Sequence, residues 1–205
     1  MSPIMAIGKL PALGAASLGT ASAVGGGYWA LTRDSKTEVK EDLKSKYKLA
    51  ILKEQADWDK KFNTLKGESN SPTYAPLKAA HDKRTSNESQ AKTLHRQACE
   101  GVYALPKDHT QNLEEFVKYC FFNNLDKKES SKNLISTNGD FQDKWSTFSA
   151  KQEKDLSPDL VEAFKGKGNS NGDSGWQQKM VSGCKKLSER IYEGENEDFK
   201  NFCLK

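Results

Sequence analysis

Two short stretches of the chain, EEFVKYCFF (residues 114–122) and EDFKNFCLK (residues 197–205), share one pattern of acidic, aromatic and cysteine residues. In each, an acidic residue precedes Phe, and an aromatic residue, a cysteine and an apolar residue follow in the same order. The two cysteines, Cys120 and Cys203, are 83 positions apart. A sequence pattern repeated at this distance predicts that the chain contains two related units.

Three further landmarks recur in the same order and at nearly the same distance. Their offsets drift by only a few residues, as expected if short deletions accumulated in loops. They are Trp58 and Trp145, Ser71-Pro72 and Ser157-Pro158, and Cys99 and Cys184, at offsets of 87, 86 and 85 residues.

Apolar residues in both units recur at spacings of three, four or seven, which indicates one buried face of a helix. We predict a long first helix over residues 38–66 and helix starts at Ser71-Pro72 and Ser157-Pro158, with Ser as the cap. No run shows sustained alternation typical of a strand. The predicted fold is therefore mostly α, with an N-terminal membrane helix followed by two tandem helical repeats over residues 38–126 and 139–205. The third helix of the second repeat is marked by Trp176, Met180, Cys184, Leu187 and Ile191.

The four cysteines are placed symmetrically about two turns. Cys99 and Cys120 flank the turn LPKDHT (105–110), and Cys184 and Cys203 flank EGEN (193–196). Residues equidistant from the turn of a helical hairpin lie opposite each other. Of the three possible pairings, only Cys99–Cys120 with Cys184–Cys203 keeps each bond within one repeat, and we predict these disulfides. Four reduced, buried thiols in a cytosolic protein are the alternative.

The first 34 residues form a separate piece. Residues 10–31, LPALGAASLGTASAVGGGYWAL, carry no charge, and Arg33 and Asp34 end the run. About 20 apolar residues are enough to span a bilayer as a helix, and Tyr28 and Trp29 lie where interfacial aromatic residues are common. We expect a membrane anchor. A signal peptide cleaved after Ala21-Ser22-Ala23 and a buried core helix are the alternatives.

The composition indicates a folded protein with a small core. Leu, Ile, Val and Phe make up only 38 of the 205 residues, but the formal net charge is just +4, which does not fit a disordered chain. The 32 basic residues are interleaved with 28 acidic ones. Because nucleic-acid binding needs a one-sided basic face, we expect no nucleic-acid partner.

No catalytic, cofactor-binding or metal-binding signature stands out, and we predict no enzyme activity. His95 and Cys99 stand four residues apart, a spacing that metal sites use. Further ligands would have to come from His81, His109 or Cys120. Because the second repeat has no histidine, we interpret His95 as a structural residue.

The Gly/Ala-rich apolar N-terminus, the lysine-rich first helix, the spaced Trp residues and the paired cysteines in CKKLSERIYEGENEDFKNFCLK (184–205) together resemble a group of paralogous proteins of haemotropic mycoplasmas. The resemblance covers nearly the whole chain, but it depends on layout and not on a catalytic motif. It implies display on the membrane of a wall-less bacterium attached to erythrocytes, with antigenic variation. It implies no functional residue.

We therefore expect a membrane-anchored protein on the extracellular face of the cell membrane, acting in binding, adhesion or antigenic variation, with a host-cell surface protein as its partner. The alternative is an inward-facing, membrane-tethered interaction module with four free thiols. The basic cluster Lys36, Lys40, Lys44, Lys46 and Lys48 favours that orientation by the positive-inside rule. The sequence does not indicate an oligomeric state.

Overall fold

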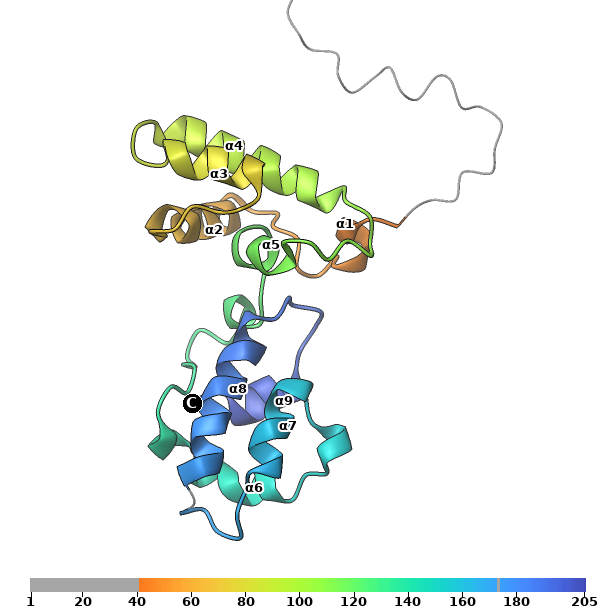
Figure 1. The fold of residues 1–205 in the computed structure, drawn as a ribbon, viewed down its shortest axis with the longest axis vertical. Coiled ribbons are helices and arrows are strands. Elements are labelled where there is room, and N and C mark those ends of the chain that lie inside the picture. Colours follow the sequence, from red (N-terminus) through yellow and green to blue (C-terminus); the bar gives the residue numbers. More distant parts are fainter. Residues whose placement is uncertain (1–40, 173) are drawn as a thin grey trace, which may run out of the picture. The chain divides into compact units, whose positions relative to one another are not determined.

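A computed structural model describes residues 41–172 and 174–205 of the chain. Within these residues the fold is all α, as predicted, and the only β-type pairing consists of isolated bridges (Figure 1). The predicted membrane segment, residues 1–34, lies outside the described residues. Within the described part of the chain, none of the helices combines the length and the apolar character that crossing a bilayer requires.

The α-helices are α1 (Leu43–Lys46), α2 (Gln55–Gly67), α3 (Ala75–Lys83), α4 (Glu88–Tyr103), α5 (Leu113–Cys120), α6 (Trp145–Ser149), α7 (Pro158–Lys165), α8 (Ser174–Glu189) and α9 (Glu197–Phe202), and the 3-10 helices are η1 (Leu125–Lys127), η2 (Asn138–Lys144) and η3 (Glu153–Asp155).

Helices α1 to α5 surround a first hydrophobic core. Phe62, Leu65, Phe116 and Phe121 are fully or almost fully buried in it. Helices α3 and α4 lie side by side, and Ala80 of α3 is fully buried.

Helices α6 to α9, with η2, surround a second core. Its largest buried side chain is Trp176, whose ring stacks on Phe148 with centroids 5.6 Å apart. Trp145, the counterpart of Trp58 among the repeated landmarks, is only half-buried and packs against Trp176, with ring centroids 5.0 Å apart. Trp58 in the first core is 6% exposed, so the two matching tryptophans are not equally buried.

The two cores are built in the same order. A 16-residue helix, α4 or α8, packs on a shorter preceding helix and is followed by a short helix that ends near a cysteine. The residue after that cysteine forms a bridge with the segment that enters the core, Phe121 with Ile51 and Leu204 with Leu134. Both partners in the second bridge are 83 positions after their counterparts in the first.

The predicted long helix over residues 38–66 is wrong within the described part of this range. Helix α1 ends at Lys46, and α2 begins only at Gln55. Between them, the Ala50 carbonyl accepts a hydrogen bond from Phe122 N–H at 2.8 Å, and Ile51 bridges Phe121. Pairing with the segment that follows α5 therefore replaces helical hydrogen bonds in this stretch.

The predicted helix start at Ser71-Pro72 is also wrong, whereas the start at Ser157-Pro158 is confirmed. Helix α3 begins at Ala75 with Tyr74 as its N-cap, and α7 begins at Pro158 with Ser157 as its N-cap. The two N-caps are 83 positions apart, which is the offset of the bridges and not that of the two Ser-Pro pairs.

Ile191 lies beyond α8, which ends at Glu189, so its assignment to that helix is wrong. Residues 190–192 pair instead with residues 122–124. Tyr192 N–H donates to the Phe122 carbonyl at 2.9 Å, and Asn124 N–H donates to the Arg190 carbonyl at 3.0 Å. Ile191 and Tyr192 consequently pack against the first core.

Candidate functional site

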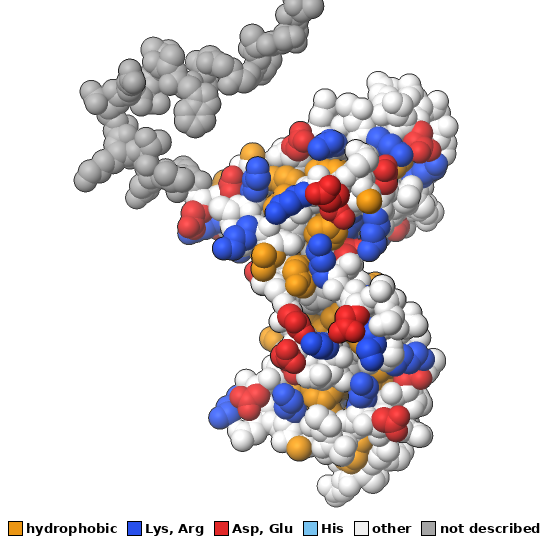
Figure 2. All heavy atoms as spheres, turned by 180° about the vertical axis from the view of Figure 1, so that it is seen from behind, with side chains coloured by type: hydrophobic (Ala, Val, Ile, Leu, Met, Phe, Trp, Pro, Cys, Tyr) orange, Lys and Arg blue, Asp and Glu red, His pale blue; other side chains and the backbone are white. Residues whose placement is uncertain are grey.

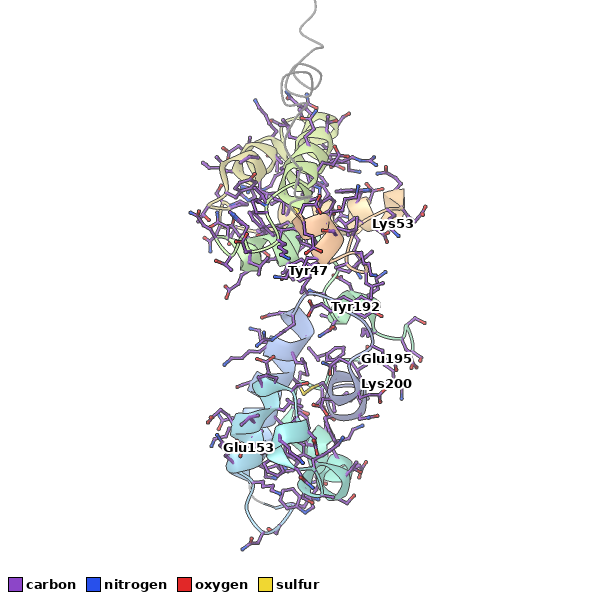
Figure 3. The ribbon with its side chains drawn as sticks, turned by 90° about the vertical axis from the view of Figure 1, so that its right-hand side faces the viewer. Tyr47, Lys53, Glu153, Tyr192, Glu195 and Lys200 are labelled. Atoms are coloured by element: carbon purple, nitrogen blue, oxygen red, sulfur yellow. A yellow bond between two sulfur atoms is a disulfide. The ribbon has the colours of Figure 1, made fainter. Side chains whose placement is uncertain are left out.

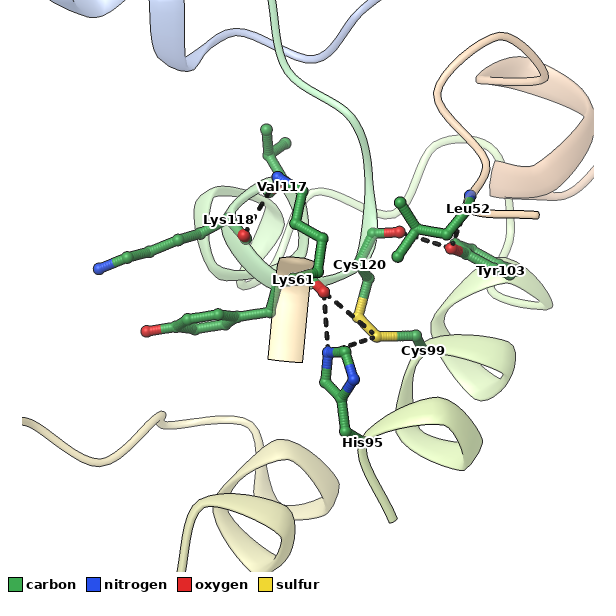
Figure 4. Close-up of a disulfide and its surroundings, with 9 residues drawn as sticks. Leu52, Lys61, His95, Cys99, Tyr103, Val117, Lys118 and Cys120 are labelled. Carbon is green, nitrogen blue, oxygen red and sulfur yellow. Dashed lines mark hydrogen bonds between the residues drawn. A yellow bond between two sulfur atoms is a disulfide. The ribbon is translucent and has the colours of Figure 1, made fainter. Parts of the chain in front are cut away.

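A disulfide links α4 to the end of α5. Cys99 and Cys120 are both fully buried, and their Cα atoms are 5.1 Å apart, within the usual range for a disulfide. Tyr103, one turn after Cys99, donates its hydroxyl hydrogen to the Cys120 carbonyl at 2.5 Å (Figure 4). Burial raises the pKa of Tyr103, so its phenol keeps the proton that this bond requires.

The second disulfide joins Cys184 in α8 to Cys203 at the end of α9. Both residues are fully buried, with Cα atoms 5.2 Å apart. The described residues include no free cysteine. The pairing that the symmetry of the sequence predicted is therefore the pairing in the structure, one bond within each helix pair.

His95 lies beside the first disulfide and is 1% exposed. Its Nε2 is 2.9 Å from the Tyr119 carbonyl and 3.6 Å from Cys99 Sγ (Figure 4). Burial lowers the pKa of His95, and the hydrogen bond to Tyr119 only partly opposes this. A neutral ring that donates from Nε2 to the carbonyl fits these contacts.

The donor atoms of His95, Cys99 and Cys120 lie within 4.8 Å of one another. The sulfur atoms of Cys99 and Cys120 are bonded to each other, so neither is a thiolate. The thiolate is the form of cysteine that binds metals. His81 and His109 are placed elsewhere: His81 Nε2 is 3.0 Å from the Glu68 carbonyl, and the His109 ring stacks on Phe116. The structure does not bring the three histidines together beside a cysteine.

A buried ion pair that the sequence analysis missed lies on α2. Lys61 is 3% exposed, and its Nζ is 2.6 Å from Asp126 Oδ2 and 3.3 Å from the Val117 and Lys118 carbonyls at the end of α5. Burial lowers the pKa of Lys61. Burial also raises the pKa of Asp126, but Lys61 and the Asn123 N–H outweigh it and the net shift is downward. Lys61 lies on the apolar stripe of α2, three residues after Trp58. This position is the feature of the sequence from which its burial could have been inferred.

Carboxylates from α5 and α9 hold the starts of α3 and α7. Glu115 accepts hydrogen bonds from Thr73 N–H at 2.5 Å and Tyr74 N–H at 3.0 Å. Asp198 accepts one from Ser157 N–H at 2.5 Å. Glu115 and Asp198 are the acidic residues that directly precede Phe in the repeated sequence pattern. The repeated pattern shows this acid, but it does not indicate which backbone groups the acid binds.

The surface of the described residues carries both charges. In the view of Figure 2, Lys and Arg side chains alternate with Asp and Glu, and apolar atoms show mainly between them. Among the described residues, Leu49 is the one large hydrophobic side chain that is largely exposed to solvent. Ion pairs such as Lys200 with Glu195 beside α9 are typical of this surface (Figure 3).

Comparison with known proteins gives no relative: no family model, no curated protein and no solved structure matches the chain.

Proposed function

We propose that this protein is a membrane-anchored binding protein whose two disulfide-bridged helical repeats are displayed on the extracellular face of the cell, with adhesion to a host-cell surface protein as its role. Antigenic variation of the displayed surface is part of the same proposal. Residues 10–31 would supply the anchor.

The observation that carries this proposal is the pair of buried disulfides, Cys99–Cys120 and Cys184–Cys203. Disulfides persist in oxidising compartments and are rare in the cytosol. The bonds therefore indicate an oxidising setting, and an extracellular position supplies one. A disulfide that closes a loop of about 20 residues stabilises a fold by roughly 3 kcal/mol, which is a large share of the stability of a small domain.

The matching contacts of the two cores support an origin by duplication of one unit. The bridges, the disulfides and the capping carboxylates recur at offsets of 83 to 85 residues. Because these contacts fix the frame, the exposed helix faces are free to change in sequence. A surface protein under antigenic selection benefits from that separation.

Two measurements on cells that produce the full chain test the proposal, thiol labelling of the extracted protein and protease digestion of the intact cells. Thiol labelling under denaturing, non-reducing conditions should find no free thiol, and four thiols should appear after reduction. Protease added outside the cells should degrade residues 38–205. Four free thiols before reduction, or survival of residues 38–205 while other surface proteins are cut, would favour the inward-facing module and refute the proposal.

A further inference from the structure

The first disulfide lies beside an imidazole. Nε2 of His95 and the sulfurs of Cys99 and Cys120 lie within 4.8 Å of one another, and all three residues are buried (Figure 4). Nε2 and Cys99 Sγ are 3.6 Å apart. In a tetrahedral zinc site, with Zn–S bonds of about 2.3 Å and Zn–N bonds of about 2.0–2.1 Å, a sulfur and a nitrogen ligand are also about 3.6 Å apart. Two of the three donor atoms therefore already have the spacing of zinc ligands.

Contacts other than the disulfide hold the end of α5 against α2 and α4. The carbonyl groups of residues 117–120, in the last turn of α5, all accept hydrogen bonds from buried side chains. The donors are Lys61 to Val117 and Lys118 at 3.3 Å, His95 to Tyr119 at 2.9 Å, and Tyr103 to Cys120 at 2.5 Å. Because none of these bonds involves sulfur, Cys120 should stay beside Cys99 when the S–S bond is reduced. The two sulfurs then need to move to about 3.8 Å from each other, their separation in a zinc site.

A groove between α2 and α4 reaches the ring of His95. Its volume is about 150 Å³, and Trp58 and Phe62 also contribute to its lining. The two cations of the lining are each paired with an acid, so the groove is not strongly positive and offers a path for a metal ion. Inside the core, the charge of Lys61 acts on His95. Two thiolates balance the charge of Zn²⁺, so an occupied site would add no net charge beside Lys61.

The second disulfide lacks the imidazole. Met180 lies four residues before Cys184, as His95 lies four residues before Cys99. A thioether is a soft ligand that suits Cu⁺, whereas imidazole and thiolate suit Zn²⁺. The two cores therefore differ in the one ligand that would complete a zinc site.

From this geometry we infer that the protein with a reduced Cys99–Cys120 pair binds one Zn²⁺ ion through both thiolates and His95 Nε2. The ring proton moves to Nδ1, and the fourth position is left to water or to the Tyr119 carbonyl. A trialkylphosphine supplies the reduction: one phosphine and one water molecule convert the disulfide into two thiols and a phosphine oxide. The two thiol protons are released to solvent when zinc binds. Zinc and the disulfide are thus alternative states of one cysteine pair, and the ion keeps that pair together before it is oxidised. The inference goes beyond the proposed function, because it concerns the chain before its disulfides form.

The test uses the purified full chain, reduced with the phosphine and kept free of oxygen, with Co²⁺ as the spectroscopic probe. We expect one Co²⁺ to bind per chain with the absorption bands of tetrahedral thiolate coordination, and one equivalent of Zn²⁺ to abolish these bands. The oxidised chain should give no bands. His95→Met gives the first pair the neighbour that the second pair has, and it should weaken binding by more than the roughly 10–100-fold that changes outside the ligand shell cause.

His81→Met is the matched control, because His81 is also a buried helical histidine whose Nε2 lies 3.0 Å from a carbonyl, that of Glu68. It should bind Co²⁺ as the unchanged protein does. Absence of the bands in the reduced chain, or equal binding by His95→Met, would overturn the inference. If reduction unfolds the chain, Zn²⁺ should restore its helical circular dichroism, since the ion binds a site that folding assembles, and no recovery would also overturn it. Four free thiols in the protein from cells would refute the proposed function but not this site, so the two tests fail separately.

Discussion

His95 and Met180 occupy equivalent places in the two cores. Each lies four residues before the first cysteine of its disulfide, and both are buried. A histidine in this position keeps one hydrogen bond, to the Tyr119 carbonyl, whereas methionine fills the same space without a polar atom to satisfy. A position filled by histidine in one core and by methionine in the other fits the structural interpretation of His95.

The buried imidazole should make stability depend on pH. The pKa of His95 is lowered from 6.5 in the folded protein, so between its folded pKa and 6.5 the unfolded chain binds more protons. The free energy of unfolding therefore falls as the pH drops below 6.5, by at most about 1.4 kcal/mol per pH unit. In His95→Met this part of the loss should vanish. Denaturant unfolding at pH 7.5, 6.5 and 5.5 without reductant measures it.

His109→Gln is the control for that comparison, because His109 is half-buried and stacks on Phe116 at the surface of the core. Comparing the two variants separates the loss of His95 from the loss of any one histidine. If the His95→Met profile runs parallel to that of the unchanged protein, His95 does not control the acid response.

At the residue scale, the sequence predicted the cysteine pairing because symmetry about two turns depends on numbering alone. It did not predict that Lys61 is buried, since a lysine on an apolar stripe is commonly read as a solvated residue whose stem snorkels. Its partner Asp126 comes from η1, 65 positions later in the chain. Only the folded arrangement brings these charges together.

At the element scale, the starts of α3 and α7 depend on a carboxylate from a distant helix. We expect Glu115→Gln and Asp198→Asn each to lower the free energy of unfolding by about 1.5–3 kcal/mol, because hydrogen bonds to charged groups contribute in this range. Glu114→Gln and Glu197→Gln change the exposed neighbouring acids and should have little effect. Equal losses in all four variants would indicate a general helix-dipole effect and not a specific contact.

The helix boundaries that the sequence missed are those set by these long-range contacts. Residues 47–54 carry apolar residues at helical spacing, yet Ala50 and Ile51 pair with the segment after α5. Ser71-Pro72 has the local signature of a helix start, but Glu115 binds the backbone at Thr73 and Tyr74 and α3 begins after them. Local propensity predicted that the chain is helical, whereas tertiary contacts set where the helices begin and end.

At the scale of the whole described chain, two cores are joined by backbone pairing and by a buried side chain. Asn124 is 6% exposed and donates from Nδ2 to the Leu187 carbonyl at 2.8 Å, near the end of α8. Asp126, two residues later, binds Lys61 of the first core. Breaking either core would leave these buried polar groups without partners, which couples the unfolding of one core to that of the other.

We therefore expect residues 41–205 to unfold in one transition, and removal of either disulfide to lower the stability of both cores. Replacing Cys184 and Cys203 by Ala should cost about 3 kcal/mol, as should replacing Cys99 and Cys120, because the sequence separations within the bonds, 19 and 21 residues, are nearly equal. Calorimetry together with the indole signals of Trp58 and Trp176 reports the two cores separately in each double variant. Simultaneous loss of both signals is the expected result. Two resolved transitions, with only the core that lost its disulfide shifted, would show that the junction does not couple the cores and that each repeat unfolds by itself.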